Sequence, residues 1–281
     1  MTLHSTTASQ SGDTTGAPAV LTGTPALSFA RVSKRFQRDG QQPLQVLRDV
    51  SFDVPNGNIV AILGASGSGK TTLLNMAAGL ILPDQGQVLV MGEPTTGRVD
   101  WSRVGYMFQD DRLLPWRVSV SNVALALEGG STRKSERLRR AKYALSFVGL
   151  SEFAQAYPHQ LSGGMRSRIA LARSIVAEPN ILLMDEPFSR LDAQTRSALH
   201  RELLQIHAAR KMSILFVTHD VEEAVTLASR IVVLSPRPGH VNRIVDVDAV
   251  QTDIESRQAR SLVVELRNII AETAENEDAH L

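Results

Sequence analysis

Eight consecutive residues limit what this chain can fold into more than any other stretch does. They read Gly64-Ala65-Ser66-Gly67-Ser68-Gly69-Lys70-Thr71 and match the phosphate-binding pattern G-x-x-x-x-G-K-[ST] without a gap. The apolar run 58–63 before them predicts a buried strand, and residues 72–78 after them predict the opening of a helix. Such a strand, glycine loop and helix point successive backbone N–H groups at one anion. We therefore predict a nucleotide-phosphate site and not a glycine-rich turn with an isolated lysine.

The residue types within this loop suit phosphate chemistry. Its glycines allow positive φ angles and a close approach of the backbone to a phosphate group. We expect Lys70 to reach the β- and γ-phosphates and the Thr71 hydroxyl to ligate Mg²⁺. The predicted phosphate-contacting set comprises Gly64, Ala65, Ser66, Gly67, Ser68, Gly69, Lys70, Thr71 and Thr72.

Composition narrows the remaining possibilities. The 281 residues suffice for one large domain or two small ones, and a hydrophobic fraction of 43% supplies a sizeable core. A net charge of +1 implies no bulk attraction to nucleic acid, and the lack of cysteine excludes disulfides and cysteine-ligated metals. No apolar run approaches the roughly 18 residues of a membrane span. Residues 1–26 are rich in Thr, Ser, Gly and Ala and do not resemble a secretion signal, so we expect a disordered tail on a cytoplasmic protein.

An antiparallel β layer is predicted ahead of the phosphate loop. Runs 27–32 and 44–54 have strand character and are separated by a predicted turn at 38–42. Phe36 lies between these runs in a polar stretch. Its ring is equally suited to stacking on a purine and to packing at the end of a strand.

Polar side chains follow three apolar strands predicted beyond the loop. These strands span 104–108, 180–184 and 213–218, and they end at Gln109, at Asp185-Glu186 and at His219. The carboxyl ends of parallel strands are where α/β sheets bind ligands. We expect Asp185 to hold Mg²⁺ through water and Glu186 to polarise an attacking water.

Gln109 and His219 each have an ordinary alternative. Gln109 is suited to contact Mg²⁺ or the attacking water, whereas a lone glutamine is more commonly a surface residue. An imidazole at the position of His219 is able to hydrogen-bond a γ-phosphate and to register its loss. A lone histidine is more often structural, but its place at the end of a strand favours the functional interpretation.

A second candidate phosphate surface lies within a mostly helical stretch, 119–177. In this stretch the charged run 133–140 is typical of a solvated helix face. Ser162-Gly163-Gly164 precedes a helical run at 169–175 and therefore forms another open helix N-terminus. Because one chain rarely needs two such surfaces for one nucleotide, we expect this one to serve a nucleotide bound on another copy.

These patterns predict an α/β fold. It has a P-loop NTPase (RecA-like) core with an antiparallel β subdomain and a helical insertion subdomain at about 112–177. A last strand is predicted at 230–235 and a C-terminal helix at 257–274. The predicted division is a tail at 1–26, an ATP-binding domain at 27–240 and a C-terminal extension at 241–281.

With these residues in order, the chain resembles the ATP-binding subunit of an ABC transporter. The resemblance covers about 27–238, and Ser162-Gly163-Gly164 matches the signature motif of that superfamily. It implies two copies arranged head to tail, with two ATP molecules between them. Each ATP is then expected to contact residues 64–72 of one copy and 162–165 of the other.

The resemblance also implies individual roles. Phe36 matches the aromatic residue that stacks on adenine, and Asp192 matches the acid of a loop that crosses the dimer interface. The implied catalytic residues are Glu186 as general base, His219 as switch, Lys70 and Gln109. The implied magnesium ligands are Thr71, Gln109 and Asp185.

A narrower resemblance concerns residues 108–116, Met165 and the turn Arg237-Pro238-Gly239, which are similar to importers for nitrate, taurine and alkanesulfonates. It implies integral membrane permease subunits, indirectly a periplasmic or extracellular solute-binding protein, and no nucleic acid partner. The chain is then expected at the cytoplasmic face of the inner membrane, with Trp116 packed against a permease helix.

Two positions depart from the family pattern, and two other functions remain as alternatives. Arg190 replaces a usually small residue where two copies approach, and Ser167 stands where this subgroup often has Gln. The alternatives are a soluble ABC-type ATPase acting on nucleic acid or ribosomes, and a nucleotide-gated dimerisation module. A metabolite kinase would leave Ser162-Gly163-Gly164 unexplained.

Overall fold

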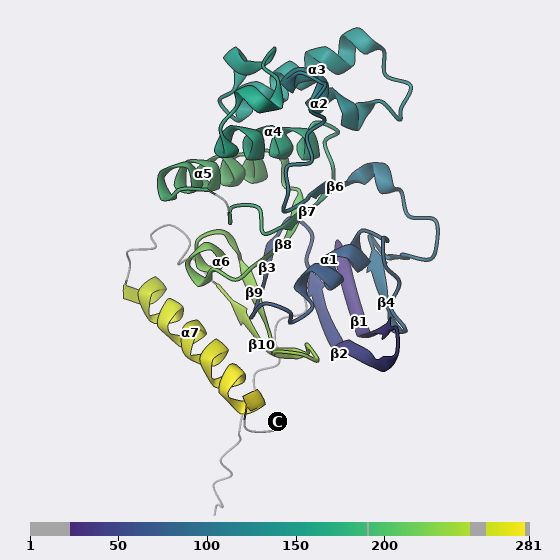
Figure 1. Cartoon of the computed structure of the whole chain (residues 1–281), viewed down its shortest axis with the longest axis vertical. Helices are drawn as coiled ribbons and strands as arrows, with labels where there is room; N and C mark the ends of the chain where they lie inside the picture. Colours follow the sequence, from purple (N-terminus) through teal and green to yellow (C-terminus); the bar gives the residue numbers. More distant parts are fainter. Residues whose placement is uncertain (1–22, 190, 248–256, 279–281) are drawn as a thin grey trace, which may run out of the picture.

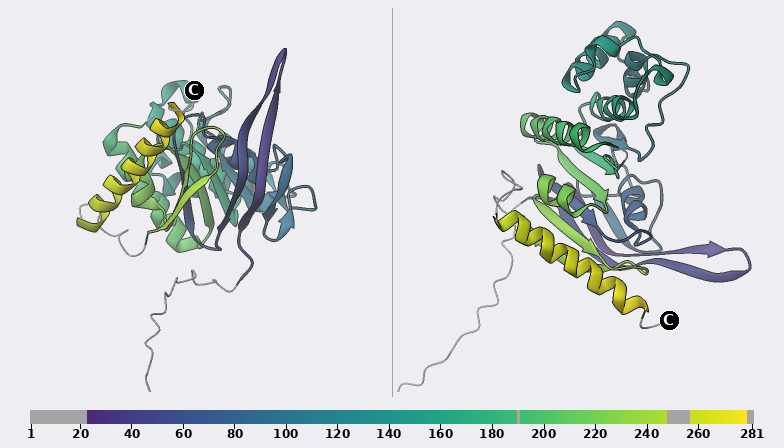
Figure 2. Two further views of the ribbon diagram at one scale, coloured as in Figure 1. Left: turned by 90° about the horizontal axis from the view of Figure 1, so that it is seen from below. Right: turned by 60° about the vertical axis from the view of Figure 1, so that its left-hand side comes forward.

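The computed structural model describes residues 23–189, 191–247 and 257–278, which form two β-sheets flanked by helices (Figure 1). The first sheet is antiparallel, with the strand order β2-β1-β4-β5. Its long hairpin, clear in Figure 2, pairs Leu27 with Val54 and Arg38 with Gln41, so the turn is shorter than the one predicted at 38–42. The strands are β1 (Leu27–Arg38), β2 (Gln41–Val54), β4 (Gln85–Val90) and β5 (Glu93–Pro94).

The second sheet forms the centre of the molecule, with the order β10-β9-β3-β8-β7-β6. All neighbours in it are parallel except β10, which pairs antiparallel with β9 at one edge. Every residue of β3, β7 and β8 is buried, which explains their uninterrupted apolar sequences. The strands are β3 (Ile59–Leu63), β6 (Val104–Met107), β7 (Ile181–Asp185), β8 (Ser213–Thr218), β9 (Arg230–Leu234) and β10 (Val241–Asp246).

The central sheet separates two hydrophobic cores. On one face, helix α1 (Lys70–Ala77) and the antiparallel sheet share a core that includes Leu73, Leu74 and Phe29. On the other face, the core contains residues of α4 (Gly163–Ile175), α5 (Ala193–Arg210) and α6 (Val221–Leu227). The antiparallel β layer predicted from the sequence is thus confirmed, and the phosphate loop and α4 belong to opposite faces.

The predicted helical stretch consists of α2 (Ser119–Ala124), α3 (Lys134–Phe147) and α4, joined by short 3₁₀ turns (Figure 1). The charged start of α3 is solvated, as predicted, because Glu136 pairs on the surface with Arg139 and Arg140. Leu145 and Ala141 turn inward and join the core of α4. Helix α4 contacts the central sheet at β6, and α2 and α3 pack on α4 farther from the sheet (Figure 1).

Both ends of the described chain differ from expectation. Residues 1–22 of the predicted tail lie outside the described residues, whereas Ala26 is buried and its N–H bonds the carbonyl of Val54 at 2.9 Å. Ala26, which was predicted to belong to the tail, is therefore part of the packed domain. Strand β10 was not predicted, because it is an exposed edge strand without an apolar run. Helix α7 (Arg257–Asp278) runs beyond the predicted 257–274.

Helix α7 is held against the body by a few contacts. Val263 and Leu266 are buried in the core that α6 shares, and Arg267 pairs with Glu222 of α6 at 2.8 Å. None of the helices that the structure describes is both long enough and apolar enough to span a bilayer.

Candidate active site

The phosphate loop connects β3 to α1 and has the conformation that its glycines permit. Gly67 and Gly69 have φ angles of 81° and 92°, in the left-handed region that favours glycine. The ammonium group of Lys70 folds back over the loop and donates hydrogen bonds to the carbonyls of Gly64 and Ala65, each at 2.9 Å. Lys70 is only 6% exposed, and this burial lowers its pKa, while the nearby Glu186 and Asp185 oppose the shift.

Two side-chain oxygens that could ligate a metal, from Thr71 and Asp185, lie together next to the loop. Thr71, the second residue of α1, is exposed, and its hydroxyl donates to the Asp185 carboxylate at 3.0 Å. Asp185 ends β7 and is 7% exposed, so burial raises its pKa. Repulsion from Glu186 adds to that rise, and the Thr71 hydrogen bond and Lys70 oppose it. A hydroxyl and a carboxylate placed this way are the hard oxygen donors that Mg²⁺ prefers.

A third group forms at the ends of three neighbouring strands. The Glu186 carboxylate accepts a hydrogen bond from the Gln109 amide at 3.2 Å and lies 3.4 Å from Nδ1 of His219. These residues follow β7, β6 and β8, which are adjacent in the sheet, so the topology brings them together. Glu186 has a φ of 42°, and its N–H bonds the carbonyl of Val217 at 3.0 Å.

Phe36 lies apart from these groups on the β1–β2 hairpin. Its side chain is 36% exposed and is not part of either hydrophobic core, although its backbone pairs with Leu44. The ammonium of Lys34 lies 5.6 Å from the ring centroid. The ring is therefore accessible for stacking, which is the first of the two alternatives that the sequence left open.

Ser162, Gly163 and Gly164 begin α4, and the first two are exposed. The Ser162 hydroxyl caps the helix by accepting from the N–H of Met165 at 3.3 Å. A Cβ on Gly164 would lie 2.9 Å from the Thr195 side chain, so glycine permits the close approach to α5. Because α4 and α1 pack on opposite faces of the central sheet, one chain does not bring this element to Lys70 (Figure 1).

Two further positions from the sequence analysis can be located. Asp192 caps α5 by accepting a hydrogen bond from the N–H of Thr195 at 3.0 Å. Arg190 lies outside the described residues, so its neighbours are not assigned.

Two arginines of α4 that were not predicted as site residues anchor the segment after Gln109. Arg166 of α4 pairs with Asp111 at 2.9 Å, and Arg173, two turns later, donates to the backbone carbonyls of Asp111 and Arg112. The spacing of seven residues, which places both on one face of α4, was the available signal. These contacts join the segment that carries Gln109 to the helix that carries Ser162.

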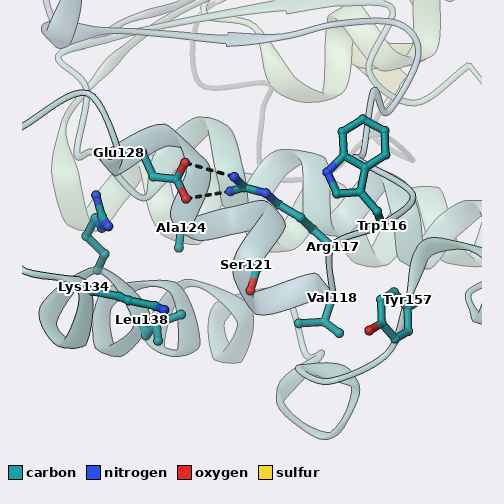
Figure 3. Close-up of a pocket in the computed structure, with 10 residues that line it drawn as sticks. Trp116, Arg117, Val118, Ser121, Ala124, Glu128, Lys134, Leu138 and Tyr157 are labelled. Atoms are coloured by element: carbon teal, nitrogen blue, oxygen red, sulfur yellow. Dashed lines mark hydrogen bonds and ion pairs between the residues drawn. The ribbon is translucent and has the colours of Figure 1, made fainter.

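A pocket of about 360 Å³ opens beside this segment (Figure 3). Arg117 and Glu128 form a two-bonded ion pair at 2.6 and 3.2 Å on one side, and Trp116 and Tyr157 stand on the other. The Trp116 side chain is 71% exposed. Trp, Tyr and Arg are among the residues enriched at protein interfaces.

Comparison with known proteins gives consistent matches. A family profile described as ABC transporter matches residues 47–189. The chain is 41% identical over 244 residues to an uncharacterised ABC transporter ATP-binding protein of Methanocaldococcus jannaschii, covering 85% of this chain and 90% of the relative. It is 43% identical over 223 residues to the taurine import ATP-binding protein TauB of Rhizobium johnstonii, covering 78% and 83%.

Two further comparisons extend this likeness. The nitrate import ATP-binding protein NrtD of Synechocystis is 45% identical over 197 residues, covering 70% of this chain and 73% of the relative. Among solved structures, a dimeric ATP-binding cassette in a post-hydrolysis state with ADP and Pi superposes with a TM-score of 0.72 at 30% identity. That alignment covers 79% of this chain and 99% of the cassette, and it confirms the predicted fold class.

Proposed function

The chain belongs to the ABC transporter family, and on that premise we propose that it is the ATP-hydrolysing subunit of an importer for a small anion such as nitrate, taurine or a sulfonate. One observation carries the proposal. The Glu186 carboxylate lies between Gln109 and His219, next to the phosphate loop, in the arrangement expected for water activation.

Nucleotide binding is assigned to the groups around the loop. The backbone N–H groups of residues 64–72 and the Lys70 ammonium are suited to the phosphates, and the exposed Phe36 ring is suited to adenine. Release of Lys70 from the carbonyls of Gly64 and Ala65 would free its donors for the nucleotide.

The residues present also fit magnesium. Thr71 and Asp185 supply a hydroxyl and a carboxylate that already touch, and Gln109 supplies an amide oxygen nearby. Within the described ranges, no cluster of three or more His, Asp or Glu side chains forms a metal cage. A few oxygen donors such as those of Thr71, Asp185 and Gln109 suit a magnesium ion that is held in part by substrate phosphates. When bound, the ion would neutralise charge that develops on the transferring phosphoryl group.

Hydrolysis is then assigned to Glu186 as the base that orients the attacking water. Gln109 donates a hydrogen bond to one oxygen of this carboxylate, and Nδ1 of His219 lies 3.4 Å from the other oxygen. His219 remains exposed enough to reach a γ-phosphate and to report on its loss.

The exposed start of α4 supports a dimer with shared sites. We infer that Ser162, Gly163 and Gly164 contact a nucleotide bound to the loop of a second copy, because Ser162 and Gly163 are exposed and α4 packs on the face of the central sheet opposite to α1. A permease is the expected partner at Trp116 and the pocket beside it. A solute-binding protein would act indirectly through that permease, and the chain would lie at the cytoplasmic face of the membrane.

The test uses the Glu186→Gln protein, in which ATP should bind without rapid turnover. We expect it to be a monomer without nucleotide and a dimer with Mg·ATP, measured by size-exclusion chromatography with light scattering. Adding Gly163→Glu should prevent the dimer while each chain still binds ATP. This is a mild change for the fold, since a Cβ at Gly163 meets only the tip of Arg166 at 3.9 Å and acidic residues suit helix N-termini.

Three results would contradict the proposal. They are a protein that binds no ATP, a Glu186→Gln protein that stays monomeric with ATP, and a dimer that Gly163→Glu leaves intact. Co-purification of the wild-type chain with an integral membrane permease separates a transport subunit from a soluble ABC-type ATPase.

A further inference from the structure

The turn between β9 and β10 lies against the outside of the phosphate loop. Strands β9 and β3 are parallel neighbours, and Val233 pairs with Leu63 just before each strand ends. The chain segments that follow them therefore leave the sheet at the same edge, 170 residues apart in sequence. The segment after β9, residues 235–240, is the turn that the sequence analysis singled out but that the proposed function does not use.

Glycines allow the turn and the loop to touch. A Cβ on Gly67 would lie 2.9 Å from the Arg237 guanidinium, and a Cβ on Gly239 would lie only 2.0 Å from the carbonyl oxygen of Ser68. In addition, Nε of Arg237 donates a hydrogen bond to the carbonyl of Gly67 at 3.3 Å. The backbone of the turn at Gly239 thus packs directly on the backbone of the loop at Ser68, and the Arg237 guanidinium adds one charged hydrogen bond to Gly67.

The turn is fixed independently of the loop. Ser235 and His240 close it through Oγ and Nδ1 at 2.6 Å and through the Ser235 N–H and His240 carbonyl at 3.0 Å. On its other side, Gly239 accepts from the N–H of Arg48 at 2.9 Å and donates to the carbonyl of Val46 at 2.8 Å, both on β2. The backbone of the turn that carries Arg237 is therefore fixed by hydrogen bonds that do not involve the phosphate loop.

Gly67 is where the loop needs such support. Its φ of 81° is accessible because it lacks a side chain, and the same freedom lets the following peptide rotate. In a trans peptide the C=O and the next N–H point in opposite directions. Holding the Gly67 carbonyl outward therefore directs the Ser68 N–H into the loop, where it now meets the carbonyl of Ala65 at 3.3 Å.

We propose that Arg237 is a positioning residue that holds the phosphate loop in its nucleotide-binding conformation through the carbonyl of Gly67. The inference rests on the proposed function, because it assigns the loop to nucleotide phosphates. Arg237 acts on the loop backbone, which cradles the phosphates common to ATP and ADP. Its loss should therefore weaken both nucleotides alike and leave the chemical step unchanged.

The experiment measures Mg·ADP binding to the wild-type background and Mg·ATP binding to the Glu186→Gln background by titration calorimetry. Arg237→Ala should raise both dissociation constants by about threefold to tenfold, as expected for one exposed charged hydrogen bond. Arg237→Lys should give intermediate dissociation constants, because an ammonium is still a charged donor but ends a shorter side chain. Arg243→Ala is the matched control, since Arg243 belongs to the same hairpin but pairs with Glu265 at 3.0 Å, away from the loop.

Steady-state ATPase assays with Glu186 intact should give a higher KM and a kcat within about twofold of wild type. A general structural role would instead lower the thermal midpoint without a selective loss of nucleotide affinity. Unchanged dissociation constants would overturn the inference, as would a loss confined to ATP, which would mean direct contact with the γ-phosphate. A wild-type protein that binds neither nucleotide would overturn the proposed function as well.

Discussion

Replacing Asp185 by asparagine should stabilise the nucleotide-free protein while it impairs the site. Asp185 is 7% exposed at the end of β7, and burial is the largest cause of its raised pKa. Glu186 adds to the rise, and the Thr71 hydrogen bond and Lys70 only partly oppose it. A carboxyl whose pKa is raised on folding is less favourable ionised in the folded protein than in the unfolded chain. At neutral pH its charge therefore costs stability.

The size of the gain follows from what asparagine keeps. Its amide oxygen still accepts from the Thr71 hydroxyl, so only the charge-assisted part of that bond, about 1 kcal/mol, is lost. Lys70 retains Glu186 as an anionic neighbour. Removing the charge also removes the cost of burying it and its repulsion from Glu186. These two gains exceed the losses, because the net shift of the Asp185 pKa is upward. We expect a net gain of about 1 kcal/mol, within the usual range of about 0.5–2 kcal/mol for a single stabilising change. This corresponds to roughly 2–4 °C in Tm for a protein of this size.

The pH dependence gives a second, independent check. Since the folded pKa lies above the ordinary value of 3.8, the stability linked to Asp185 is fully present below the unfolded pKa and is lost as pH rises through the folded one. The advantage of Asp185→Asn should therefore be largest near pH 7 and shrink as the pH falls through the raised pKa. Thermal and urea unfolding in EDTA, without nucleotide, measure this difference.

Asp84→Asn serves as the control of opposite sign. Burial alone would raise the pKa of Asp84, but hydrogen bonds from the Lys34 ammonium and the Arg35 N–H hold it below its usual range. Its stabilising contribution is therefore present above the unfolded pKa and is lost as pH falls. Asp84→Asn should lower Tm slightly at pH 7, by no more than about 2 °C because the pair is exposed to solvent. Two results would refute the reasoning. One is a Tm of Asp185→Asn below that of wild type at pH 7, and the other is a Tm difference between the two proteins that grows as the pH falls.

Three further outcomes are expected. Glu186→Gln should slow phosphate release by at least about 100-fold with ATP affinity retained, and near-normal turnover would remove Glu186 as the base. Phe188→Ala should cost about 3–5 kcal/mol in urea unfolding, because the ring is 1% exposed and packs edge-on against His200 at 4.6 Å; a cost below about 1 kcal/mol would mean that the core closes over the gap. Trp116→Ala should leave Tm and ATPase activity of the isolated subunit unchanged but reduce its recovery with the permease, whereas equal recovery would place the docking surface elsewhere.

The buried central strands and the polar residues that follow them could be predicted from the sequence, because short apolar runs mark such strands. Strands β3, β7 and β8 are buried on both faces, and burial of that kind requires uninterrupted apolar runs. The polar residues that follow such runs had to meet at one edge of a parallel sheet. Gln109, Glu186 and His219 were each predicted at the end of a strand, and the structure places Gln109 3.2 Å and His219 3.4 Å from the Glu186 carboxylate.

Contacts between remote segments had no such signal. Arg237 reaches Gly67 across 170 residues, and nothing near either residue indicates the other. Arg173 binds the carbonyls of Asp111 and Arg112, and a bond to a backbone carbonyl does not depend on the identity of the accepting residue. Strand β10 alternates too weakly to be distinguished from a loop, because it is the edge strand of the central sheet and its residues are half-buried or exposed. These features arise from the assembled fold and not from local propensity.

The placement of α1 and α4 on opposite faces has a consequence for how the proposed sites must form. Helix α1, which follows the phosphate loop, and helix α4, which Ser162 caps, belong to cores on opposite faces of the central sheet, and β3, β7 and β8 between those cores are fully buried. A second copy is able to supply the missing element. If one copy presents Gly163 to the loop of its partner around a two-fold axis, symmetry makes the partner return the same contact. The two sites therefore form together, and binding at one loop should favour closure over the other through the shared interface.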